Sequence, residues 1–180
     1  MATTWNSVGT DHRLDHHHLR GVVGLSLSAA MPTAGYLLVN AIADASGLVP
    51  IAATPMGLPS WTVAAATMIT LPLWGVARWL VAQHGDAGRV ASRWIIALIA
   101  GAILLPFALT SANTFLASLL PMLVLLTGIV AAMRASALSA TAGLLMLPGL
   151  VGLGVGSLIG FTALAGGWSP PFALVDHNKH

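Results

Sequence analysis

The sequence contains no cysteine. This absence excludes disulfide bonds, thiolate metal sites, iron–sulfur clusters, lipoprotein attachment and palmitoylation, because each of them requires a thiol. It gives no indication of the redox compartment in which the protein works.

Charged residues are also scarce, at 7% of the 180 residues, whereas 57% are apolar. So few polar side chains cannot cover the surface of a water-soluble domain. The formal net charge of +2 is small, and the sequence has none of the Lys and Arg stripes that nucleic-acid binding requires. We therefore expect the lipid bilayer, and no nucleic acid, as a partner.

Five apolar segments approach or exceed the length of about 20 residues that a helix needs to cross a bilayer. They cover residues 21–43, 61–81, 94–110, 115–133 and 138–164. The third and fourth are joined by so few residues that they must form an antiparallel hairpin. The sequence therefore predicts an all-α integral membrane protein with a bundle of five transmembrane helices over 21–167, a His-rich segment before it (1–20) and a short tail after it (168–180).

All seven Lys and Arg residues except Lys179 lie before the first segment or at alternate gaps between the segments. In chain order they are Arg13 and Arg20 before the first segment, Arg78, Arg89 and Arg93 where the second gives way to the third, and Arg134 between the fourth and fifth. Residues 44–60 and 111–114 contain no Lys or Arg. Because cytoplasmic loops collect basic residues, we predict a cytoplasmic N-terminus and an external C-terminus, in a multi-pass protein of the bacterial inner membrane.

The tryptophans agree with this orientation, since their amphipathic rings prefer the level of the lipid headgroups. Trp61 and Trp168 would lie at the outer interface, and Trp79 and Trp94 at the inner one. Arg78 lies within one turn of the inner end of its segment, from where its long side chain can reach the headgroups. We expect these five residues to be interfacial anchors; a buried functional charge is the alternative for Arg78.

The predicted spans contain no Asp, Glu, His or Lys, and Arg78 is their single charged residue. Proton relays, ion coupling, haem ligation and metal catalysis inside a membrane depend on such groups. We therefore expect no intramembrane haem or metal ligands. The spans also offer no nucleophile paired with a base, which indicates that the protein is not an enzyme and leaves any cofactor undetermined.

Each predicted span contains one proline, a residue that frees a carbonyl group one turn back. They are Pro32, Pro72, Pro106, Pro121 and Pro148. These prolines indicate either fixed kinks that shape a compact bundle or hinges for gating.

In the fifth span Gly152, Gly156 and Gly160 recur at intervals of four residues. A helix face stripped of side chains in this way allows another helix to approach closely, which is the main source of helix association in lipid. The pattern predicts a packing face, and the partner helix belongs to this chain, to a second copy or to another protein.

The N-terminal segment holds the densest group of possible metal ligands. If it is helical, His12 and His16 share one face and Asp15 lies beside them. Three consecutive histidines cannot all converge from a helix, and short His-rich tracts are often solvated. We therefore predict no metal site, with His12 and His16 as the candidates if one forms.

Two functions fit these observations. The first is an accessory or structural subunit that packs on other membrane subunits, or on a second copy, through helix faces and the apolar outer segment 47–59. The second is a small permease component, or a substrate-binding membrane subunit, for a neutral or apolar solute. Hydroxyl and amide side chains would line its path, although such groups more often bond to a helix. They are Ser26, Ser28, Thr33, Asn40, Thr67 and Thr70. An odd number of spans does not divide into equal inverted halves, which favours the accessory role.

Overall fold

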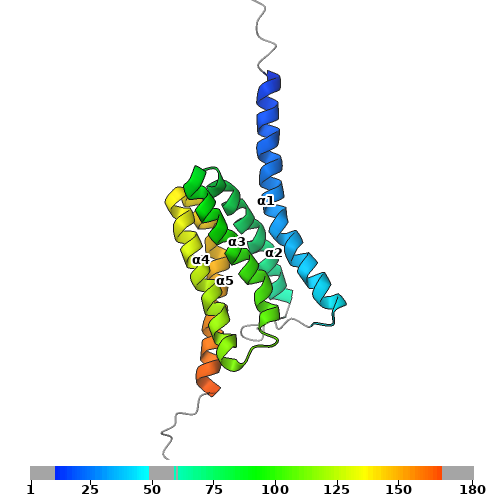
Figure 1. Ribbon diagram of the computed structural model, residues 1–180, viewed down its shortest axis with the longest axis vertical. Coiled ribbons are helices and arrows are strands. Elements are labelled where there is room, and N and C mark those ends of the chain that lie inside the picture. The colour runs from blue at the N-terminus through cyan, green and yellow to red at the C-terminus, as the bar shows by residue number, and fades with distance from the viewer. Residues whose placement is uncertain (1–10, 49–58, 60, 168–180) are drawn as a thin grey trace, which may run out of the picture.

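The computed structural model describes residues 11–48, 59 and 61–167. In this part of the chain five α-helices follow one another in alternating directions (Figure 1). They are α1 (Asp11–Ala45), α2 (Trp61–Ala82), α3 (Gly85–Ala108), α4 (Thr114–Leu138) and α5 (Ala140–Gly167). Each contains a stretch long and apolar enough to cross a membrane. The prediction of five such helices is confirmed.

Four of the helices form a closed antiparallel bundle, and α1 lies outside it (Figure 1). α2 packs against α3, α3 against α4, α4 against α5, and α5 back against α2. α1 packs mainly against α2 and touches α3 over a short stretch, and its N-terminal turns project beyond the bundle. The ring follows from the short links, because helices joined in this way lie antiparallel to their neighbours.

The links within the bundle are short and carry capping groups. The side chain of Asn113 accepts the amide N–H of Leu116 at 2.9 Å, at the start of α4. Ser139 alone separates α4 from α5, and its hydroxyl accepts the amide N–H of Ala142 at 3.3 Å. Such acceptors satisfy N–H groups that have no partner inside the helix. Both links thus fix their helices as hairpins. The sequence predicted the first of these hairpins, that of α3 and α4.

Two helices begin well before their apolar segments. α1 begins at Asp11 instead of residue 21, and α3 at Gly85 instead of residue 94. Polar turns remain helical in α3 because Asp86 pairs with Arg89 one turn later, and because alanine and arginine favour helix. Apolar content marks the length that is suited to cross hydrocarbon, whereas the helix itself continues beyond that length.

The core lies between the four helices of the bundle. On α2 and α3 it consists of Leu71, Trp74, Ala77, Val81, Ala91, Ile95, Leu98, Ile99 and Ile103, and on α4 and α5 of Ala131, Ala135, Ala142 and Met146. Large side chains thus come from α2 and α3, and mainly alanines from α4 and α5. Small residues let α4 and α5 approach closely, and the resulting van der Waals contact is what holds helices together in lipid.

The five prolines all lie inside helices. α1, which contains Pro32, changes direction midway along its length (Figure 1). A proline removes one backbone hydrogen bond and crowds the preceding turn, which bends a helix at that place.

Candidate functional site

The glycine face predicted in the fifth span lies on the C-terminal half of α5. A Cβ atom added at Gly152 or Gly156 would meet no heavy atom within 4 Å. Gly152 is exposed and Gly156 is half-buried. The surroundings of Gly160 lie outside the described part. Within the residues that the structure describes, no helix of this chain covers the face at Gly152 and Gly156, and its use for packing stays a prediction.

Other glycines make the close contacts inside the molecule. A Cβ atom added at any of five positions would lie less than 3.0 Å from a neighbouring atom, which real Cβ atoms essentially never do. The five are Gly75, Gly88, Gly128, Gly143 and Gly149. Gly75 faces the backbone of Ser28 on α1, and Gly149 faces the indole of Trp74 on α2. These contacts set how closely α1 and α5 approach α2.

Sequence reasoning gave no role to Gly75, Gly88, Gly128 or Gly143, although a signal for the contact between α1 and α2 was present. Gly24, Ser28 and Pro32 recur at intervals of four on α1, and this row faces α2: Gly24 lies against Trp79, and Ser28 against Gly75. Small residues at that interval are typical of a close helix contact. The row therefore identifies the face on which α1 docks.

The predicted anchors lie in different surroundings. Trp61 at the start of α2 is 67% exposed, and Trp94 near the start of α3 is 38% exposed. Trp79 is half-buried, and its indole nitrogen would lie 3.1 Å from a Cβ atom at Gly24. Trp79 therefore packs on α1 as well as lying near the end of α2. Trp168 lies outside the described residues.

Trp74, to which the sequence analysis gave no role, is the tryptophan of the core. It is 2% exposed. Its indole N–H donates to the backbone carbonyl of Met146 on α5 at 3.4 Å, and its ring contacts Gly149. A buried indole requires such an acceptor. Trp74 thus joins α2 to α5 and closes the ring of four helices.

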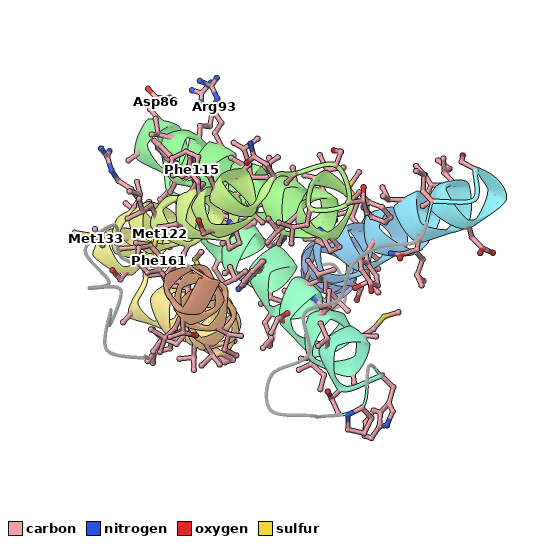
Figure 2. The ribbon with its side chains drawn as sticks, turned by 90° about the horizontal axis from the view of Figure 1, so that it is seen from below. Asp86, Arg93, Phe115, Met122, Met133 and Phe161 are labelled. Atoms are coloured by element: carbon pink, nitrogen blue, oxygen red, sulfur yellow. The ribbon has the colours of Figure 1, made fainter. Side chains whose placement is uncertain are left out.

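Arg78 connects α2 with α3 at one end of the bundle. It is half-buried, and its Nε donates to Ser92 Oγ at 3.3 Å. In the described ranges the one ion pair joins Arg89 to Asp86 on the exposed start of α3. Asp86 and Arg93 project outward from the same side of α3 (Figure 2). Because α4 ends where α3 begins, Arg134 lies at this end as well.

Polar side chains within the helices mostly bond to their own helix. Asn40 donates to a carbonyl one turn back at 2.8 Å, and Thr67 and Thr70 do so at 2.9 and 3.2 Å. Two hydroxyls differ: Thr33 Oγ1 and Ser157 Oγ are buried with no hydrogen-bond partner in the described part of the chain. The side chains that bond to their own helix are structural, whereas the hydroxyls of Thr33 and Ser157 remain able to bond to another group.

The N-terminal histidines lie on a helix. His12 and His16 belong to the first turns of α1 and are one helical turn apart. The side chains of residues 11–20 lie outside the described part of the structure, so the expectation for His12 and His16 stays a prediction. Among the side chains that the structure describes, no group of three or more His, Cys, Asp or Glu residues is placed to hold a metal ion.

No protein-family model, curated protein or solved structure matches the chain. The fold alone therefore defines the class of protein. Five helices that are each long and apolar enough to cross a membrane indicate a multi-pass membrane protein.

Proposed function

We propose that all five helices span a bacterial inner membrane, with the N-terminus in the cytoplasm and the C-terminus outside. Four arginines share one end of the bundle: Arg78, Arg89, Arg93 and Arg134. At the opposite end, neither Asp44 to Leu48 nor the α3–α4 link contains a Lys or Arg. Short loops rich in basic residues stay on the cytoplasmic side, which supports this orientation.

Within that membrane, the protein is an accessory or structural subunit of a larger complex and not an enzyme. The observation that carries this proposal is the glycine face on α5, where Gly152 and Gly156 each have room for a side chain and no helix covers them among the described residues. A helix surface of this kind gains van der Waals and Cα–H···O contacts when a second helix approaches. The proposed occupant is a transmembrane helix of another subunit.

The composition of the core supports the same role. In the described part, the buried polar residues are Ser118 and Ser157, and every other buried side chain of the core is apolar. Transport coupled to protons or ions requires ionisable groups inside the membrane, and Arg78 lies at the edge of the bundle. An apolar interior of this kind suits a subunit that packs on others better than one that couples transport to ions.

A small permease component for a neutral or apolar solute is the second candidate. The buried hydroxyls of Thr33 and Ser157 favour it, because a solute could satisfy their unused hydrogen bonds. However, Thr33 lies on α1 and Ser157 on α5, and these two helices make no contact in the described part of the chain. The two hydroxyls therefore do not define one path.

Crosslinking in native membranes tests the accessory role. A Gly152→Cys variant of this cysteine-free chain, labelled with a photoreactive maleimide, reports what covers the glycine face. We expect an adduct with one different membrane protein. Leu126→Cys on α4, at a position that is 55% exposed, is the control and should yield lipid adducts. Lipid adducts from both positions, or an adduct of two copies of this chain, would contradict the proposal. Solute uptake by the purified protein in liposomes would instead establish the permease component.

A further inference from the structure

Two Arg-Trp pairs meet where α2 passes into α3. Arg78 and Trp79 lie near the end of α2, and Arg93 and Trp94 lie near the start of α3. The two helices are antiparallel neighbours, and Ser92, which directly precedes Arg93, accepts the Nε–H of Arg78 at 3.3 Å. Both pairs therefore lie at the same level of the bundle, on adjacent helices.

The charges at this hairpin do not balance. The hairpin carries three guanidinium groups but one carboxylate, that of Asp86, which pairs with Arg89. Arg78 and Arg93 have no carboxylate within ion-pair distance among the described residues. The other aspartate with a described side chain, Asp44, lies at the far end of α1. Unmatched cations at the edge of a low-dielectric region favour an anion from outside the chain.

The hydrogen bond to Ser92 also orients Arg78. A guanidinium has five N–H donors in a planar fork. The bond from Nε to Ser92 is the one hydrogen bond that the Arg78 side chain makes in the described part, so the outer Nη donors remain for a ligand. A planar pair of donors matches the oxygens of a phosphate group. The indole of Trp94, which is 38% exposed, is the kind of ring that lies at the headgroup level beside such phosphates.

We propose that Arg78 and Arg93 bind the phosphodiester of an anionic phospholipid at the α2–α3 hairpin, with Ser92 holding the Arg78 guanidinium in position. Trp79 and Trp94 flank the site at the boundary with the acyl chains. The site rests on the membrane insertion proposed above and not on the accessory role. A soluble phosphate presents the same oxygens, and the two sources are separable by experiment.

The test uses the full chain in nanodiscs of phosphatidylcholine, with or without phosphatidylglycerol as the minor lipid. Native mass spectrometry counts the lipids that remain bound, and a thermal scan gives the midpoint of unfolding. We expect phosphatidylglycerol to be retained and to raise the midpoint. Arg78→Gln keeps a donor for Ser92 but loses the charged fork, and should weaken retention about tenfold, the effect of losing a hydrogen bond to a charged group. Arg134→Gln, at the same end but on α4, is the control and should retain the lipid.

A second arm adds inorganic phosphate to the phosphatidylcholine nanodiscs. A rise in the unfolding midpoint that requires Arg78 would assign the site to soluble phosphates, whereas a response to phosphatidylglycerol alone assigns it to the lipid. Equal retention of phosphatidylglycerol and phosphatidylcholine would overturn the site. Equal losses of phosphatidylglycerol retention in Arg78→Gln and Arg134→Gln would overturn it as well, since the arginines would then attract the lipid only through their summed charge. Failure of the folded chain to enter nanodiscs would overturn membrane insertion, and with it both the lipid site and the transmembrane occupant proposed for the glycine face.

Discussion

Gly75 of α2 lies directly against the backbone carbonyl of Ser28 on α1. This carbonyl is the one that Pro32 leaves without a donor, because proline has no amide hydrogen to give to the residue four positions earlier. A Cα–H bond of Gly75 is therefore directed at an oxygen that α1 does not satisfy itself, in a weak C–H···O contact. The proline on one helix and the glycine on the other together place α1 on the bundle.

Replacing Gly75 by alanine should separate α1 from α2. The new Cβ would overlap the backbone of Ser28, which cannot move aside as the end of a side chain can. We expect the free energy of unfolding in mild detergent to fall by about 1–3 kcal/mol, the usual effect of overpacking. Gly152→Ala is the matched control: its Cβ has open space, and alanine exceeds glycine in helix propensity by up to about 1 kcal/mol. Equal stabilities of the two variants would contradict the contact.

Trp74 should contribute more to stability than any exposed tryptophan. Because its side chain is 2% exposed, Trp74→Ala leaves a cavity between α2 and α5. We expect a loss of about 3–5 kcal/mol in the free energy of unfolding. Trp74→Phe retains a ring but removes the donor to Met146, and should lose about 0.5–1.5 kcal/mol. Trp61→Ala, at a position that is 67% exposed, serves as the comparison, and a similar loss there would count against the core role of Trp74.

A large side chain on the glycine face should affect assembly but not folding. Gly156→Leu points into open space, so the isolated protein should keep its stability to within about 0.5 kcal/mol. Its recovery with partner subunits from native membranes should fall. Gly149→Leu on the same helix should instead unfold the protein, because Gly149 lies against Trp74. If Gly156→Leu leaves recovery with partners unchanged, the glycine face is an ordinary lipid-facing surface.

Hydropathy predicted the five helices because crossing hydrocarbon requires a continuous apolar length, and no other signal competes with it. It did not predict that α3 begins at Gly85, because a polar turn held by Asp86 and Arg89 is helical without being apolar. It also did not predict which helices are neighbours. The contacts of Gly75 with Ser28 and of Gly149 with Trp74 pair residues far apart in the chain. Hydropathy does not identify such pairs, because an apolar side chain suits a contact with lipid as well as a contact with protein.

Single cysteines at Asp44 and Asp86 test the orientation in this cysteine-free chain. Asp44 lies at the end of α1 and Asp86 at the start of α3, so they lie at opposite ends of the bundle. With the basic end in the cytoplasm, an impermeant maleimide should label intact cells at Asp44→Cys alone. Labelling of Asp86→Cys in intact cells, with Asp44→Cys protected, would reverse the orientation.

The mass of the native particle tests the central claim most directly, that this chain is a subunit of a larger membrane complex. The protein should be extracted from its own membranes with its surrounding lipid and weighed by native mass spectrometry, with the bound polypeptides identified. The proposal predicts a particle well above the 18.4 kDa of one chain, in which a different membrane protein is present in fixed ratio and is lost in the Gly156→Leu variant. A particle of one chain with lipid alone, at the same expression level, would contradict it.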